Sequence, residues 1–304
     1  MNGLINVFKE KDMTSHDVVA QLRKILGTKK IGHGGTLDPE VEGVLVIGVG
    51  KGTRILEYIT NSGKGYEGEL AFGYTSDTED MTGILTKKPY AEALLNLKEI
   101  DLLFEKLSGQ EIMQIPPMYS SVKIEGRKLY EYAREGKVIK REARPIFIET
   151  IERISDFYEL ETGIKMAFYA KVSKGTYIRT LCVTIGESIG IPTVMSSLKR
   201  VSVGTFKIEN AFKLTDIKEK LEKNDISFLL PLKTGIENEM LLYEPSKAEA
   251  KNLYYGQTIE NKEKFGDGRQ IACLYEGSLY SICEIKENNM KVLKNLCGVK
   301  DGIF

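Results

Sequence analysis

The chain has 304 residues, which is enough for one large domain or two ordinary ones with a sizeable core. Its 43 Lys and Arg residues balance 43 Asp and Glu residues, so the overall charge favours neither nucleic acid nor a membrane as partner. No apolar stretch is long enough for a membrane span or a secretion signal, and we therefore expect a cytoplasmic protein with no membrane partner.

The first elements are a short apolar strand, Leu4 to Phe8, and a helix that Thr14 or Ser15 caps. Gly27 is suited to end this helix. Apolar residues recur on one helical face and belong to the core: Val18, Val19, Leu22, Ile25 and Leu26.

The stretch from Ile31 to Gly52 is the most informative part of the chain. Three glycines precede Asp38 and Pro39 follows it, so a carboxylate lies on a loop whose backbone can approach a partner closely. The apolar run at 43–49 predicts a buried strand that supports this loop. Asp38 is therefore the first candidate for catalysis, although an Asp-Pro pair also serves in ordinary turns.

Neither a nucleotide nor a metal site is indicated. The run GVGKGT resembles a P-loop, but Gly52 follows Lys51 where Ser or Thr would bind magnesium. The carboxylates at 77–80 lack the spacing of a calcium loop, so we expect a solvated loop there. We expect no metal site and reduced thiols, because the histidines and cysteines show no metal-binding spacing: His16, His33, Cys182, Cys273, Cys283 and Cys297.

Period-2 and helical patterns continue through the middle of the chain. Alternation in Tyr66–Phe72 predicts a half-buried strand that opens with Tyr66, either a core aromatic or a platform on which a base stacks. Residues 91–107 predict a helix, and two prolines require residues 115–122 to be extended. Residues 128–134 predict a short surface helix that mixes aromatic and basic side chains.

A second alternating stretch, Ile164–Val172, predicts another strand, after which Thr176 can cap a helix that begins at Tyr177. Arg179 would then lie in the first helical turn directly after a strand, which is a rigid mount for a guanidinium. Taken alone, such an arginine more often forms a surface ion pair.

The C-terminal part predicts a small β-rich module beyond a boundary at residues 237 and 238. A strand at 201–208 and a helix at 215–223 precede the boundary. The module itself has a short helix and three strands: 244–253, 270–275, 278–285 and 290–296.

Three segments carry positive charge inside this neutral chain. Residues 119–145 contain eight basic and four acidic side chains. Residues 171–200 contain five basic and one acidic, and residues 9–33 contain six basic and three acidic. If they came together in space they would form a face that binds a polyanion, although charge alone favours the reading that they are solvated surfaces.

Several motifs resemble the bacterial TruB-type tRNA pseudouridine synthases, which isomerise the uridine at position 55 in the T loop of tRNA. They are GHGGTLDP with GVLVIGVGKGTR, then GYEGELAFGYTSDTED, IPPMYSSVKIEGRKLYEYAREG followed by ARPI, and SKGTYIRTL. The resemblance covers about residues 9–206, and motifs in this number and order are specific. The C-terminal module is similar to the PUA-like domain of the family, less sharply.

The resemblance implies that Asp38 is the catalytic carboxylate, that Tyr66 stacks against the target base and that Arg179 pairs with the carboxylate. His33 would occupy the space that the flipped base leaves. Further substrate-binding roles are implied for Lys9, Lys123, Tyr177 and Leu198. Glu10 and Asp12 depart from the family pattern K-P-x-G-x-T-S, in which Pro and Gly stand at their positions.

We therefore predict an α+β protein with a pseudouridine synthase domain at residues 1–237, built on a mixed, mainly antiparallel sheet. A basic RNA-gripping insertion at 119–145 belongs to this domain, and a PUA-like RNA-binding domain covers 238–304. The expected partner is the T stem-loop of tRNA, and a monomer suffices. We expect no cofactor, because no step of the isomerisation that the resemblance implies is a redox or hydrolytic one. The alternative is a non-catalytic protein that binds or folds tRNA.

Overall fold

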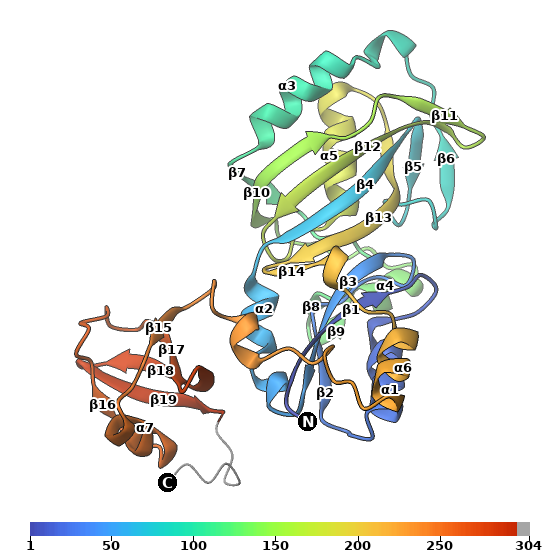
Figure 1. The fold of residues 1–304 in the computed structure, drawn as a ribbon. Coiled ribbons are helices and arrows are strands. Elements are labelled where there is room, and N and C mark those ends of the chain that lie inside the picture. Colours follow the sequence, from blue (N-terminus) through green and yellow to red (C-terminus); the bar gives the residue numbers. More distant parts are fainter. Residues whose placement is uncertain (297–304) are drawn as a thin grey trace. The chain divides into compact units, whose positions relative to one another are not determined.

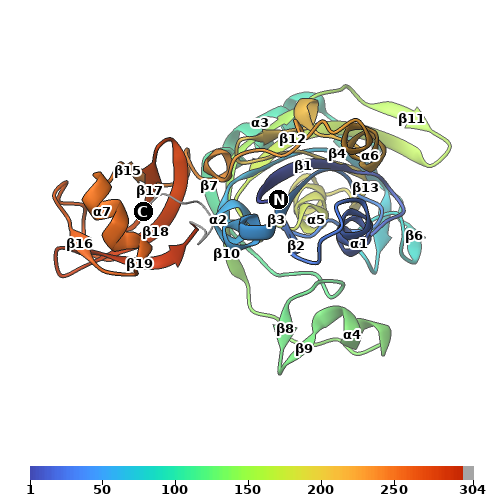
Figure 2. The ribbon, with the colours of Figure 1, turned by 60° about the horizontal axis from the view of Figure 1, so that its bottom comes forward.

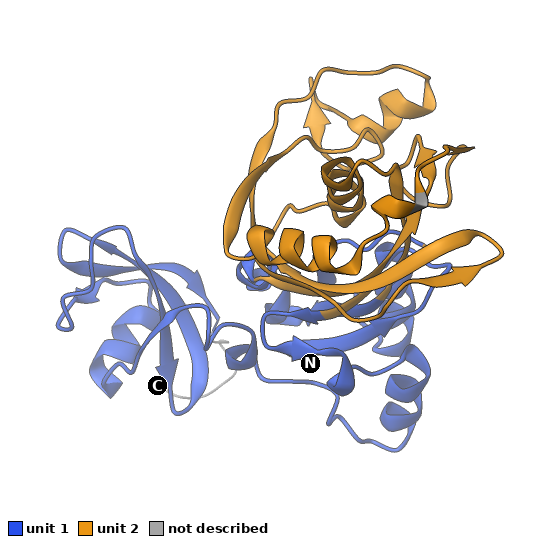
Figure 3. Ribbon diagram, turned by 90° about the horizontal axis from the view of Figure 1, so that it is seen from above, with its two compact units in different colours: residues 1–39, 43–62, 202–304 blue, residues 40–42, 63–201 orange. Residues whose placement is uncertain are grey.

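The computed structural model describes residues 1–296, and Cys297 lies outside this range. The chain divides into unit 1 (residues 1–39, 43–62 and 202–304) and unit 2 (residues 40–42 and 63–201) (Figure 3). Both combine helices with mainly antiparallel strands, which confirms the α+β class (Figure 1). No helix within residues 1–296 is long and apolar enough to cross a membrane.

Unit 1 begins with β1 (Gly3–Lys9), which pairs antiparallel with β3 (Glu42–Val49) along its whole length. A strand that the sequence did not predict, β2 (Ile31–Gly34), also pairs with β3. Helix α1 (Ser15–Ile25) starts at a capping box formed by Thr14 and Asp17. The predicted strand and helix are thus confirmed.

The run GVGKGT, which resembles a P-loop, allows close packing of the backbone. It forms the 3-10 helix η1 (Gly50–Arg54), followed by α2 (Leu56–Asn61). A Cβ atom on Gly52 would lie 2.1 Å from the carbonyl oxygen of Gly3, and one on Gly48 would lie 2.6 Å from the carbonyl carbon of Gly52. The glycines therefore let this turn pack directly against β1 and β3.

The later part of unit 1 returns along β1, where Leu4 and Leu230 exchange backbone hydrogen bonds of 2.9 and 2.7 Å. The predicted strand at 201–208 is instead a hairpin, because Gly204 (φ 52°) turns the chain back between β13 and β14. β13 (Thr193–Val203) belongs to unit 2 up to residue 201, and only its last two residues belong to unit 1. The elements that follow it in unit 1 are β14 (Phe206–Lys207), η3 (Ile208–Asn210), α6 (Leu214–Glu222) and η4 (Leu232–Gly235).

The C-terminal module is a five-stranded sheet in the order β15-β17-β18-β19-β16. Its core includes Leu253, Ile271 and Tyr280. The predicted helix and three strands are confirmed, while the boundary at 237 and 238 stays a prediction. The elements are β15 (Leu241–Tyr243), α7 (Lys247–Tyr254), β16 (Ile259–Glu260), β17 (Gln270–Tyr275), β18 (Ser278–Lys286) and β19 (Asn289–Asn295).

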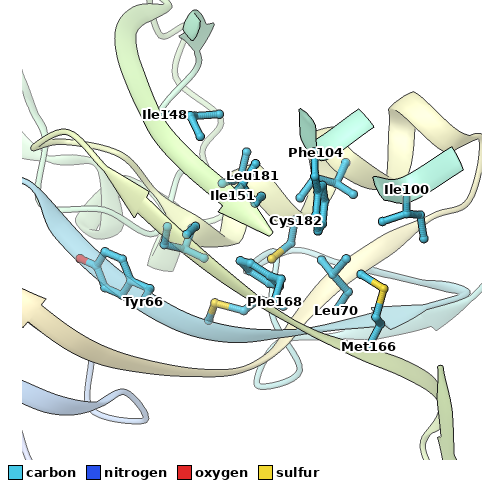
Figure 4. Packing of buried hydrophobic residues seen from close by; sticks show 14 of the residues in the cluster. Tyr66, Leu70, Ile100, Phe104, Ile148, Ile151, Met166, Phe168, Leu181 and Cys182 are labelled. Carbon is cyan, nitrogen blue, oxygen red and sulfur yellow. The ribbon is translucent and has the colours of Figure 1, made fainter. Parts of the chain in front are cut away.

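Unit 2 is built on an antiparallel ladder in the order β4-β12-β10-β7. Helices α3 and α5 cover one face of this ladder. The rings of Phe104 (α3) and Phe168 (β12) pack edge to face, with their centroids 6.4 Å apart (Figure 4). The elements are β4 (Lys64–Phe72), η2 (Glu92–Leu94), α3 (Leu97–Leu107), β7 (Gln110–Gln114), β10 (Arg144–Arg153), β11 (Tyr158–Leu160), β12 (Gly163–Val172) and α5 (Ile178–Ile189).

Two hairpins extend from unit 2. One is formed by β5 (Tyr74–Ser76) and β6 (Leu85–Lys87). The other belongs to the predicted basic insertion and stands away from the sheet of unit 2 (Figure 2). We call it the basic lobe, and it consists of β8 (Lys123–Ile124), β9 (Arg127–Lys128) and α4 (Leu129–Arg134).

Candidate active site

Asp38 lies on an exposed loop between β2 and β3 that is held on both sides of the aspartate. Before it, the Leu37 N–H donates to Ser15 Oγ at 2.9 Å. After it, the Pro39 carbonyl accepts from Lys9 Nζ at 3.0 Å and from the Asp12 N–H at 3.1 Å. An exposed carboxylate on a loop that is held in place suits a reacting group that must meet its substrate in a fixed position.

Lys9 is fully buried, and its ammonium group also donates to the carbonyls of Glu10 (2.9 Å) and Met13 (2.7 Å). Asp12 has φ 62°, the left-handed conformation for which glycine is usual. The turn therefore closes without the Pro and Gly of the family pattern. A substrate-binding role for Lys9 stays a prediction, since these contacts show it supporting the Asp38 loop.

His33 is the third predicted site residue in unit 1. It lies in β2 opposite Ile47 of β3, and its side chain is half-buried. Its role toward a flipped base stays a prediction.

Tyr66 and Leu198 lie together in unit 2. Tyr66 pairs with Ala170 across β4 and β12 and is 8% exposed, as part of the core between the sheet and its two helices (Figure 4). Leu198 of β13 is half-buried against the same core. This position agrees with the reading of Tyr66 as a core aromatic, and its role as a stacking platform stays a prediction.

Arg179 is held in a fixed orientation by its neighbours. It lies in the first turn of α5, 7% exposed, and donates from Nη1 to the Thr78 carbonyl (3.0 Å) and from Nη2 to the Tyr119 carbonyl (2.8 Å). Asp80 Oδ2 lies 3.7 Å from Nη1. These partners fix the guanidinium plane, which a flexible surface ion pair would not do.

The start of α5 is fixed as well, although not by Thr176, whose hydroxyl donates to the Ser173 carbonyl instead. The buried side chain of Gln114 binds the backbone of Tyr177 twice. Its Nε2 donates to the Tyr177 carbonyl (3.1 Å), and its Oε1 accepts from the Tyr177 N–H (2.8 Å). The Tyr177 side chain is half-buried, and its role in substrate binding stays a prediction.

The expectation of a solvated loop at 77–80 is wrong for two of its carboxylates. Glu79 and Asp80 are half-buried against α5, where Thr180 Oγ1 donates to Glu79 Oε2 at 2.5 Å. Burial raises the pKa of Glu79 above its ordinary value, and Thr180 and Arg179 oppose that shift. Within residues 1–296 no group of three or more His, Cys, Asp or Glu side chains is arranged to hold a metal ion.

The basic lobe combines cations with aromatic rings. The Arg127 guanidinium lies 4.5 Å from the Tyr132 ring centroid, and Arg134 lies 5.3 Å from that of Tyr130. Lys123 is exposed on β8 opposite Lys128 of β9. Such a surface suits phosphate contacts and base stacking.

The predicted residues thus fall into two sets. Lys9, His33 and Asp38 belong to unit 1. The joint action of Asp38 with residues of unit 2 stays a prediction. The set in unit 2 is Tyr66, Lys123, Tyr177, Arg179 and Leu198.

Comparison with known proteins gives the family. Residues 23–178 match the TruB family pseudouridylate synthase (N terminal domain). The chain is 45% identical over 302 residues to tRNA pseudouridine synthase B of Streptococcus agalactiae serotype III (strain NEM316), covering 97% of this chain and 99% of that protein. The chain belongs to the TruB family of pseudouridylate synthases. Another TruB relative, tRNA pseudouridine synthase B of Streptococcus mutans serotype c (strain ATCC 700610 / UA159), is 41% identical over 296 residues, with the same coverage.

Solved structures agree with the TruB assignment. A chain of a Cbf5-Nop10-Gar1 complex superposes with a TM-score of 0.73 at 25% identity, covering 97% of this chain and 85% of that one. A chain of an H/ACA RNP bound to a substrate RNA containing 2'-deoxyuridine gives 0.71 at 24% identity, with the same coverage, which shows a common fold. The predicted pseudouridine synthase fold with a small C-terminal PUA-like module is confirmed.

Proposed function

We propose that this TruB-family enzyme converts uridine to pseudouridine at position 55 in the T loop of tRNA. The observation that carries the proposal is an exposed Asp38 on a braced loop in a chain that matches tRNA pseudouridine synthase B proteins over nearly its full length. The T stem-loop is the proposed partner, and the proposed active form is a monomer.

Asp38 is the proposed reacting group. Moving a base from its C–N bond to a C–C bond needs a nucleophile or base near the sugar and C6 of the ring, and an ionised carboxylate can serve as either. Arg179 would pair with this carboxylate and keep it charged at neutral pH. The fixed guanidinium supports this role, because its plane is set before substrate arrives.

The target uridine must leave the base stack to reach Asp38, which costs a few kcal/mol. The ring of Tyr66 offers a surface that offsets part of this cost by stacking. Leu198, which packs against the same core, would shape that surface, while His33 would fill the space left in the RNA loop.

The RNA itself would be held by its phosphates. The basic lobe supplies cations and aromatic rings on a projection from unit 2, with Lys123 on its exposed strand. Phosphate contacts position an RNA without reading its sequence, and a T loop is recognised largely by shape. Tyr177 would complete the substrate-binding set, and Lys9 would serve substrate binding through the Asp38 loop that it supports.

Asp38→Asn separates catalysis from RNA binding. We expect this variant to form no pseudouridine while it binds unmodified tRNA with an affinity within about threefold of wild type, since only the carboxylate charge is removed. Asp156→Asn, an equivalent change at an exposed aspartate, is the control. Full activity in Asp38→Asn would remove the proposed catalytic role.

A further inference from the structure

The turn between β5 and β6 contains a carboxyl group that the proposed chemistry does not use. Glu79 lies in this turn between Thr78 and Asp80, the two residues that contact Nη1 of Arg179. We propose that Glu79 is a positioning residue, which ties this turn to Thr180 of α5 and thereby sets the Thr78 carbonyl and the Asp80 carboxylate around the guanidinium. This inference rests on the role of Arg179 in the proposed function.

The side chain of Glu79 makes the first connection. Thr180, the residue after Arg179 in α5, donates from Oγ1 to Glu79 Oε2 at 2.5 Å. Because Thr180 and Arg179 are neighbours on one rigid helix, this bond fixes the distance between the turn and the guanidinium.

The backbone of Glu79 makes the second connection, to β13. The Met195 N–H donates to the Glu79 carbonyl at 3.1 Å, and the Met81 N–H donates to the Met195 carbonyl at 3.1 Å. Glu79 is therefore fastened to α5 by its side chain and to β13 by its main chain.

The backbone conformation of Glu79 shows that these contacts act against local preference. Its φ of 64° lies in the left-handed region, which is unfavourable for an L residue other than Gly, Asn or Asp. A residue stays in this region only where its surroundings fix it.

The carboxylate of Asp80 shows how the turn presents its partners. Its Oδ1 accepts from Thr78 Oγ1 (2.6 Å) and from the N–H (2.9 Å) and Oγ1 (2.6 Å) of Thr82, while Oδ2 faces Arg179. The turn holds Asp80 in one orientation, so a displacement at Glu79 moves both partners of Nη1 together.

The test compares three variants in single-turnover pseudouridine formation and in tRNA binding. We expect Glu79→Ala to lower the rate constant at least tenfold, with an affinity for unmodified tRNA within about twofold of wild type. Glu79→Gln should restore most of the rate, because its amide oxygen still accepts from Thr180. Thr180→Val removes the hydroxyl donor alone and should lower the rate in the same direction.

The double variant Glu79→Ala/Thr180→Val should be no slower than Glu79→Ala, since both changes break the same hydrogen bond. Glu187→Ala, at an exposed position of the same helix, is the control and should match wild type. An unchanged rate in Glu79→Ala overturns the inference, as does a Glu79→Gln rate no better than that of Glu79→Ala. If Glu79→Ala fails to fold, Thr180→Val decides. The proposed function has separate tests: it fails if the wild-type chain forms no pseudouridine at position 55, or if Asp38→Asn keeps full activity.

Discussion

Arg179 Nη1 and Asp80 Oδ2 lie 3.7 Å apart, although 99 positions separate the two residues in the chain. Both side chains are mostly buried, with exposed fractions of 8% and 14%. This pair differs from an exposed ion pair, because the guanidinium also binds the carbonyls of Thr78 and Tyr119. The arginine is therefore held by two segments, the turn that contains Thr78 and Asp80 and the backbone at Tyr119.

The fixed guanidinium makes a prediction for Arg179→Lys. Lysine keeps the charge but cannot donate in two directions from a plane, so one of the carbonyls that Arg179 binds loses its donor. We expect the free energy of unfolding to fall by about 1–3 kcal/mol and pseudouridine formation to fall more than tenfold, as measured by urea unfolding and single-turnover assay. Arg269→Lys, at an exposed position, is the control. Wild-type activity in Arg179→Lys would show that the plane of the guanidinium is unimportant.

Replacing Lys9 should lower both the stability and the activity of the protein. Its buried ammonium serves the carbonyls of Glu10, Met13 and Pro39, the last directly after Asp38. Lys9→Met leaves these carbonyls without that donor, and we expect the free energy of unfolding to fall by about 1–3 kcal/mol and the rate constant to fall with it. The exposed neighbour Lys11→Met should change neither. A stable Lys9→Met protein with weakened tRNA binding alone would instead show that Lys9 contacts substrate.

Removing positive charge from the basic lobe and the segment after it should change the salt dependence of tRNA binding. The variant replaces by Gln both Lys123 of the lobe and the exposed Lys140, which follows the lobe in the basic insertion at 119–145. It should bind more weakly and lower the slope of log affinity against log salt by about 0.7–0.9 for each phosphate that it no longer neutralises. Filter binding at several salt concentrations measures the slope. Gln at both Lys218 and Lys223, in and just after α6, is the control. An equal slope in the lobe variant and wild type would place the RNA elsewhere.

Glu249, in the C-terminal module, should contribute to the free energy of unfolding in a pH-dependent way. Burial alone would raise its pKa, but hydrogen bonds from Lys262 and Ser246 hold the pKa at about 2, below the ordinary 4.5. A lowered carboxyl pKa stabilises the folded state above pH 4.5, and this stabilisation is lost as the pH falls toward 2.

Glu249→Gln should therefore lower the free energy of unfolding by about 1–2 kcal/mol at pH 7, a value reduced because Lys262 is largely exposed. The difference from wild type should shrink in unfolding measured at successively lower pH. A difference that is constant from pH 7 to pH 3 would contradict the assignment.

Elements with uninterrupted periodicity could be predicted from the sequence, and others could not. β4 and β12 alternate cleanly and were predicted. β10 was missed because a bulge between Ile148 and Thr150 changes which positions point inward, and β7 because Gln114 is its one buried residue.

The candidate site divides in the same way. Asp38 and Arg179 are found through motifs, because each motif is local. The hydrogen-bond acceptors of Arg179 are backbone carbonyls 60 and 101 positions away, and the position of a backbone carbonyl cannot be inferred from residue type. Glu79 was read as solvated because its contact with Thr180 is equally distant in the chain.

The most direct measurement is the mapping of pseudouridine in an unmodified tRNA transcript incubated with the purified wild-type chain. The account predicts one product, at position 55 of the T loop, which is absent with Asp38→Asn. Pseudouridine at another position, or product that persists in Asp38→Asn, would contradict it.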